Sequence, residues 1–208
     1  AFFCAALAGN SDINVCVNSD LSVSCNCHDV DGSGWIGHLG QSSLAEVFAG
    51  PVARRFRQEL AAGRLPTPQC SRCCDLRSVS RDKALRLADR HRLPAFLMVE
   101  NTSRCNLQCA SCPRPQIRRL RAKPSMSLDD VRRVAQQVRE AGVASVAYLN
   151  FGEPFLSKNI RQELEILREE NPGLRINTST NAMAIDCDEK RAAALLVDRI
   201  QISLDGID

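Results

Sequence analysis

The stretch "AFLMVENTSRCNLQCASCPR" (residues 95–114) joins a short apolar run to a loop that carries three cysteines. Residues 95–101 have the length and composition of a buried β-strand. Cys105, Cys109 and Cys112 follow in the spacing C-x3-C-x2-C, which favours metal binding. Three protein ligands leave one position of a metal centre open, so the spacing indicates chemistry more than a structural role. The spacing alone allows zinc as well as iron.

The residues after this loop alternate helix and strand. Ser127 and Asp130 resemble a capping box, and Gly142 marks the end of the helix that they begin. Helices are predicted at 127–142, 159–171 and 188–197, and further strands at 145–151, 174–181 and 199–205. Short connections in the order βαβαβαβ predict an α/β fold with a parallel sheet and right-handed crossovers.

Residues 1–78 have a different pattern. Residues 12–27 alternate apolar and polar positions around turn residues and predict a β-hairpin. An amphipathic helix is expected from Ser42 to Gly63, with an interruption at Gly50 and Pro51. Cysteines bracket the whole segment, at positions Cys4, Cys25, Cys27, Cys70, Cys73 and Cys74. Such a small α+β module has a thin core, which a bound metal would stabilise. Residues 79–94 are predicted to form a linker helix.

Composition narrows the class of protein. The chain has 208 residues, a net charge of +3 and eleven cysteines. The small net charge argues against a nucleic-acid partner, and no apolar stretch is long enough to cross a bilayer. We therefore expect a cytoplasmic protein that does not bind membranes. Cysteines at this density in the cytoplasm indicate metal sites more than disulfides.

Each of the four predicted parallel strands ends in polar sequence. After the cysteine loop these ends are Asn150–Pro154, Asn177–Asn181 and Ser203–Gly206. In parallel sheets and barrels, catalytic and ligand-binding residues lie at the carboxyl ends of the strands. These four clusters are therefore expected to share one rim.

These features together resemble the radical S-adenosylmethionine superfamily over residues 95–208. The cysteine loop after the first strand, "GEP" after the second and the polar third and fourth strand ends match that family in order. The resemblance implies the first four strands of an incomplete (βα) TIM-type barrel. We expect the chain to be a fragment, with the carboxyl half of the barrel missing.

The resemblance also implies roles for individual residues. Cys105, Cys109 and Cys112 would hold a 4Fe-4S cluster whose open iron binds S-adenosylmethionine, which is cleaved to a 5'-deoxyadenosyl radical that abstracts a substrate hydrogen. Gly152 and Glu153 would receive the methionyl amine. The carboxylate or ribose of S-adenosylmethionine would contact Thr178, Ser179, Thr180, Asn181, Ser203 and Asp205. Each of these residues could equally be an ordinary strand or turn residue.

The amino-terminal segment is similar to a SPASM-type auxiliary cluster domain, placed here before the barrel. That similarity implies a second 4Fe-4S cluster on Cys4, Cys25, Cys70 and Cys73, with Cys27 or Cys74 as substitutes. A structural zinc site is the alternative, because the same cysteine spacing serves zinc.

Three candidate functions are considered, of which the first two follow from these resemblances. The leading one is hydrogen abstraction from a peptide or protein substrate, with electrons from an external donor such as flavodoxin or ferredoxin. A sugar or other small molecule is the alternative substrate. A non-catalytic metal-binding or electron-transfer module is the third. The basic run at 114–123 could attract an anionic group, but the favoured interpretation is a solvated surface. Substrate identity and oligomeric state are not encoded in any motif.

Overall fold

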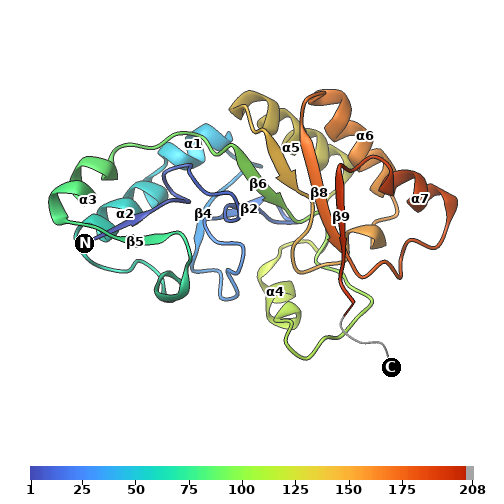
Figure 1. The fold of residues 1–208 in the computed structure, drawn as a ribbon, viewed down its shortest axis with the longest axis horizontal. Coiled ribbons are helices and arrows are strands. Elements are labelled where there is room, and N and C mark those ends of the chain that lie inside the picture. The colour runs from blue at the N-terminus through green and yellow to red at the C-terminus, as the bar shows by residue number, and fades with distance from the viewer. Residues whose placement is uncertain (205–208) are drawn as a thin grey trace.

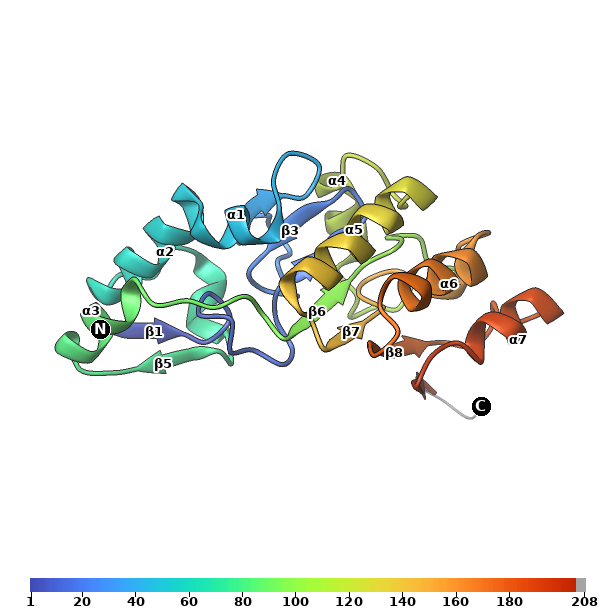
Figure 2. The ribbon, with the colours of Figure 1, turned by 90° about the horizontal axis from the view of Figure 1, so that it is seen from above.

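The computed structural model describes residues 1–204, which form a seven-stranded mixed sheet with helices on one face and a small two-stranded sheet beside it (Figures 1 and 2). The strand order of the large sheet is β4-β3-β2-β6-β7-β8-β9. No helix among these residues is long and apolar enough to cross a membrane.

The carboxyl-terminal half of the large sheet has the predicted βα alternation. Its four strands are β6 (Phe96–Val99), β7 (Ser145–Ala147), β8 (Arg175–Thr180) and β9 (Arg199–Ile202), and every neighbouring pair is parallel. The intervening helices are α5 (Leu128–Ala141), α6 (Ile160–Glu170) and α7 (Asp188–Ala194). The predicted parallel order is confirmed, although the strands are shorter than the apolar runs suggested.

Local signals set the ends of helix α5. Ser127 and Asp130 form the predicted capping box, and Gly142 ends the helix with a left-handed φ of 67°. The inward positions Val131, Val134 and Val138 are at most 1% exposed. Burying a side chain of this size contributes about 1.5–3 kcal/mol, so the apolar stripe stabilises the helix mainly through packing.

The amino-terminal hairpin belongs to the same sheet. Strands β2 (Cys16–Val17) and β3 (Ser22–Ser24) are antiparallel, as the predicted hairpin requires, and β4 (Trp35–His38) follows β3. Strand β2 also pairs in parallel with β6, so that Cys16 lies opposite Met98. One hydrophobic core therefore runs through both parts of the chain and includes Val17 and Leu97.

The remaining amino-terminal elements lie at the far end of the molecule from α7 (Figure 1). The helix expected from Ser42 to Gly63 is divided, as predicted, into α1 (Leu44–Ala49) and α2 (Pro51–Ala61). A 3-10 turn, η1 (Pro68–Arg72), precedes β5 (Leu76–Ser78), which pairs with β1 (Phe2–Cys4). The same segment ends with helix α3 (Arg81–Ala88).

The linker helix predicted at 79–94 is only partly correct. Helix α3 ends at Ala88, and the chain continues without regular structure to β6. Pro94 disfavours helical backbone at Leu93, and the chain is tied to the loop after β1 by the Arg92 amide, which donates to Ala8 O at 3.2 Å. The extended link allows β6 to enter the sheet beside β2.

Candidate functional site

The three cysteines of the C-x3-C-x2-C pattern lie on one excursion between β6 and α5. Helix α4 (Arg114–Leu120) forms part of this excursion, which Figure 1 shows beside the carboxyl ends of the parallel strands. The excursion is closed at its base, where Ser103 N donates to Pro124 O at 2.8 Å and Thr102 Oγ1 lies 2.8 Å from Ser125 Oγ. The cysteine loop is therefore fixed at both ends.

The thiols themselves are accessible. Cys105 and Cys112 are half-buried, and Cys109 is exposed. Leu107 N donates to Cys105 Sγ at 3.4 Å, and Cys112 N donates to Cys109 O at 3.1 Å. Three soft thiol donors on one loop fit an iron-sulfur cluster with one open position, because thiolates are the usual ligands of such clusters.

Gly152 allows the segment after β7 to pack against the base of the cysteine loop. A Cβ at this position would lie 1.8 Å from Thr102 O and 2.9 Å from Arg104 O. Glu153 N also donates to Arg104 O at 2.7 Å. Any residue larger than glycine would push the two segments apart, so Gly152 determines where the cysteine loop begins.

The carboxylate of Glu153 joins the ends of β7 and β8. Glu153 is 2% exposed and accepts hydrogen bonds from Thr180 Oγ1 at 2.6 Å, Asn181 N at 2.9 Å and Phe155 N at 3.1 Å. These donors satisfy a buried charge that would otherwise be costly. The carboxylate thereby orients Asn181, whose side chain reaches the cysteine loop.

The two faces of β8 have different roles. Thr178 and Thr180 are 3% exposed, and Thr178 Oγ1 donates to Tyr148 O at 2.7 Å. Ser179 and Asn181 lie on the other face, where Asn181 Nδ2 donates to Asn106 Oδ1 at 2.9 Å and lies 4.0 Å from Cys105 Sγ. Asn181 therefore contacts the cysteine loop directly, whereas the two threonine hydroxyls already have protein partners.

The end of β9 approaches the same face. Ser203 Oγ lies 3.4 Å from Ser179 Oγ. Asp205, the other residue predicted at this strand end, lies outside the described residues 1–204. Ser179, Asn181 and Ser203 are thus the predicted cofactor contacts that the structure brings together on the accessible side of the sheet.

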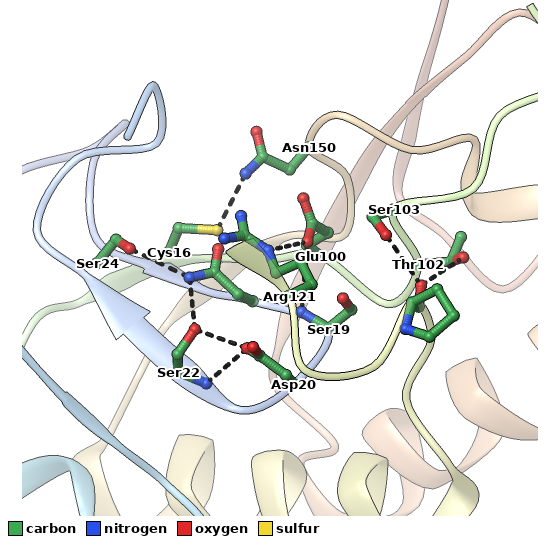
Figure 3. Close-up of polar contacts among 12 residues, drawn as sticks. Cys16, Ser19, Asp20, Ser22, Ser24, Glu100, Thr102, Ser103, Arg121 and Asn150 are labelled. Carbon is green, nitrogen blue, oxygen red and sulfur yellow. Dashed lines mark hydrogen bonds and ion pairs between the residues drawn. The ribbon is translucent and has the colours of Figure 1, made fainter. Parts of the chain in front are cut away.

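A buried ion pair lies at the base of the cysteine excursion (Figure 3). Arg121 Nε donates to Glu100 Oε1 at 2.8 Å, and the two side chains are 4% and 0% exposed. The same carboxylate oxygen accepts a bond from Ser19 N at 3.4 Å. The interpretation of 114–123 as a solvated basic surface is therefore wrong for Arg121, which reaches inward from the end of α4. The sequence placed Glu100 in a predicted strand and Ser19 in a predicted hairpin turn, but neither pattern indicates that the two residues meet.

The turn of the amino-terminal hairpin completes this base. Ser19 Oγ donates to Lys123 O at 3.0 Å, and Ala122 N donates to Asp20 Oδ2 at 2.9 Å. Cys16 is buried beside the ion pair and accepts a bond from Asn150 Nδ2 at 3.3 Å (Figure 3). Burial, reinforced by the Glu100 carboxylate, raises the pKa of the Cys16 thiol. The amino-terminal segment thus contributes to the support of the cysteine loop.

Four amino-terminal cysteines surround one small cavity. Its lining includes Cys4, Cys25, Cys70 and Cys73, which were the primary ligands inferred from the sequence. Burial raises the pKa of the Cys4 thiol to about 12, and the nearby Cys73 and Asp75 add to this effect. Burial also raises the pKa of Cys25, with contributions from Cys4, Cys70 and Cys73. A convergent group of soft donors fits a metal centre, because a cation would offset the cost of forming the thiolates.

Cys27 and Cys74 line a different cavity, of about 570 Å³, together with Cys73 and His28. Cys27 Sγ lies 3.2 Å from His28 Nδ1 and 3.3 Å from Asn14 Oδ1. Asn14 Nδ2 lies 3.7 Å from Cys74 Sγ. Within residues 1–204, no group of three histidine, cysteine, aspartate or glutamate side chains is arranged as ligands of a single metal ion. In a cluster, by contrast, each thiolate binds a different iron.

Part of the chain is similar to known proteins. Residues 99–208 match the family described as the Radical SAM superfamily. A GTP 3',8-cyclase of Streptomyces coelicolor is 31% identical over 134 residues, which are 63% of this chain and 39% of that protein. GTP 3',8-cyclase 2 of Mycobacterium tuberculosis is 32% identical over 117 residues, which are 54% of this chain and 31% of that protein. The chain therefore spans less than two fifths of these relatives.

A solved structure, "Crystal structure of BtrN in complex with AdoMet and 2-DOIA", also resembles part of the chain. The TM-score is 0.44 at 22% identity, over 53% of this chain and 46% of the other.

Proposed function

The chain belongs to the radical SAM superfamily, whose cofactors are a 4Fe-4S cluster and S-adenosylmethionine, and we propose that Cys105, Cys109 and Cys112 hold that cluster here. The observation that supports this proposal most strongly is the position of the three thiols on one excursion fixed at its base. With both cofactors bound, the site would supply a 5'-deoxyadenosyl radical for hydrogen abstraction.

The protein's own residues would bind and orient S-adenosylmethionine. Asn181 contacts the cysteine loop, and Ser179 and Ser203 lie next to each other on the same face of the sheet. Their polar side chains suit the ribose and the methionyl carboxylate. Gly152 and Glu153 border the same position and are proposed to receive the methionyl amine. The Glu153 carboxylate also accepts hydrogen bonds from Thr180 and Asn181, so it would position Asn181 as well.

A second 4Fe-4S cluster is proposed for the amino-terminal cavity, with Cys4, Cys25, Cys70 and Cys73 as ligands. This arrangement would give residues 1–78 the auxiliary role that their SPASM-like pattern implies. All four primary ligands line this cavity, whereas Cys27 and Cys74 do not, which favours the primary ligands over the two substitutes.

We propose a small molecule as the substrate. The curated relatives named above are GTP 3',8-cyclases, whose printed name refers to a nucleotide. The SPASM-like cysteines suggest a peptide or protein substrate instead. That substrate class stays a second candidate, because those cysteines line one cavity.

The proposed activity is tested by incubating anaerobically reconstituted protein with dithionite and S-adenosylmethionine and measuring 5'-deoxyadenosine. We expect turnover that is lost in Cys105→Ala/Cys109→Ala/Cys112→Ala and retained in Cys187→Ala, whose thiol is exposed at the start of α7. Turnover in the triple variant equal to that of the parent would contradict the assignment.

The substrate class is tested by adding either the small-molecule or the macromolecular fraction of an anaerobic cell extract. Stimulation of 5'-deoxyadenosine formation by the small-molecule fraction alone is the expected result. Stimulation by the macromolecular fraction alone would favour the second candidate.

A further inference from the structure

The cysteine excursion has an uneven charge distribution. Residues 101–128 contain six basic side chains and no acidic one: Arg104, Arg114, Arg118, Arg119, Arg121 and Lys123. Arg121 is neutralised by Glu100, and Lys123 pairs with Asp130 at 2.5 Å. Within the described residues, the other four arginines are in no ion pair. The excursion therefore carries an uncompensated positive charge.

Helix α4 presents this charge to solvent at a fixed position. Ile117 is fully buried and anchors the helix, whereas Arg118 and Arg119 are exposed. Leu120 is 39% exposed and adds an apolar contact beside them. Arg114 Nη2 donates to Leu107 O at 2.7 Å and ties the helix to the cysteine loop. We call the surface formed by Arg114, Arg118, Arg119 and Leu120 the α4 surface.

The α4 surface adjoins a proposed cluster ligand. A surface hollow of about 450 Å³ is lined by both Arg119 and Cys112, together with Ser111 and Gln116. Cys109, on the same loop, is exposed. A protein that covers the α4 surface would therefore lie directly against the loop that receives electrons in the proposed reaction.

We propose that the α4 surface docks a small acidic protein that carries single electrons. This inference rests on the proposed function, because reductive cleavage of S-adenosylmethionine needs an electron that the chain does not itself supply. The carrier would lose one electron and the cluster held by Cys105, Cys109 and Cys112 would gain it, without transfer of other atoms. Arginines that are in no ion pair, with the partly exposed Leu120 beside them, favour an acidic partner, since complementary charge accelerates encounter and fixes orientation.

Two alternative occupants are less well supported. A nucleic acid would be expected to use stacking aromatic side chains beside the basic ones, and residues 101–128 contain no phenylalanine, tyrosine or tryptophan. An anionic substrate would need an enclosed site, whereas Arg118 and Arg119 are exposed on the outer side of a helix.

The test compares Arg118→Glu/Arg119→Glu with Arg81→Glu/Arg86→Glu. Both variants change the net charge equally, and Arg81 and Arg86 are exposed on α3, which lies away from α4 at the left end of Figure 1. Binding to flavodoxin and, separately, to ferredoxin is measured by calorimetry at low and high salt. We expect the α4 variant to weaken binding of at least one carrier about tenfold or more and to flatten its salt dependence, with little effect of the α3 variant.

Activity with two reductants separates docking from chemistry. The α4 variant is expected to keep its dithionite-driven formation of 5'-deoxyadenosine and to lose the carrier-driven reaction, whereas Arg118→Lys/Arg119→Lys keeps both. Unchanged binding of both carriers to the α4 variant would overturn the docking proposal. A raised KM of this variant for substrate, with normal carrier binding, would overturn it as well. Absence of dithionite-driven cleavage in the parent protein would instead contradict the proposed function.

Discussion

The carbonyl oxygen of Thr102 lies against the α-carbon of Gly152, so closely that a Cβ at position 152 would be 1.8 Å from it. This contact joins the segment after β7 to the start of the cysteine loop. Two carboxyl-terminal strand ends therefore form one unit, and the position of the proposed cluster depends on a residue that cannot itself bind metal.

The Gly152→Ala variant tests this contact. We expect it to destabilise the protein by about 1–3 kcal/mol, because the backbone at Thr102 must move to admit a methyl group. We also expect less iron bound after reconstitution. The matched control is Gly173→Ala, since a Cβ at Gly173 meets no atom within 4 Å. Equal unfolding midpoints and equal iron contents for the two variants would refute the proposed role of Gly152.

The buried pair of Arg121 and Glu100 is tested by removing one charge at a time. Arg121→Met is expected to cost about 3–5 kcal/mol in urea unfolding, because it leaves Glu100 charged and unpaired inside the protein. The double variant Arg121→Met/Glu100→Gln should recover part of that loss. Arg132→Met, at the exposed pair with Asp129, should cost about 1 kcal/mol or less. A similar small cost at Arg121 would mean that the pair does not support the loop.

The ionisation of Glu163 makes the free energy of unfolding depend on pH. Burial raises the pKa of this carboxyl above its ordinary value of 4.5, although Ser157, Asn101 and Tyr148 all donate to it. Between 4.5 and the raised pKa, the folded state binds more protons than the unfolded state. The contribution of Glu163 to the stability of the folded state is therefore fully present below pH 4.5, and it declines as the pH rises through the raised pKa of the folded state.

The measurement compares urea unfolding of the parent protein and Glu163→Gln at successive pH values from 4.5 upward. The stability of the parent relative to the variant is expected to decrease as the pH increases through this window. A difference that stays constant, or that grows with pH, would show that burial does not raise the pKa of Glu163.

Sequence patterns predicted the parallel half of the fold well, for physical reasons visible at individual residues. Ser127, Asp130 and Gly142 determine the ends of α5 through local hydrogen bonds and backbone conformation, so a single sequence reveals them. The pairing of β2 with β6 was not predicted, because β2 has only two residues and its partner lies about 80 positions away along the chain. No local pattern records such a contact.

The candidate site was predictable to a similar extent. Cys105, Cys109 and Cys112 are identified by spacing within one loop, and the glycine of "GEP" by its place after a strand. Spacing did not reveal that Thr178 and Thr180 face away from Ser179 and Asn181, since this depends on where β8 begins its alternation. Nor did it reveal Glu100 and Ser19, whose interaction forms only when the hairpin turn meets the end of β6.

The amino-terminal cysteines are tested by single replacements. Cys25→Ser should remove about four irons per chain from the reconstituted protein and lower its unfolding midpoint, because one ligand of the proposed closed cluster is lost. Cys27→Ser should keep the iron, since Cys27 lines a different cavity. Loss of iron from Cys27→Ser with full retention in Cys25→Ser would reverse the assignment of ligands.

The most direct test of the central assignment is the reduced-state EPR spectrum of the anaerobically reconstituted protein, recorded before and after addition of S-adenosylmethionine. The parent protein should contain about eight irons and show a spectral change on addition, because the open iron gains a new ligand. Cys105→Ala/Cys109→Ala/Cys112→Ala should keep about four irons and lose the change. Zinc in place of iron, or a spectrum in the parent that S-adenosylmethionine does not alter, would contradict an open iron at these three cysteines.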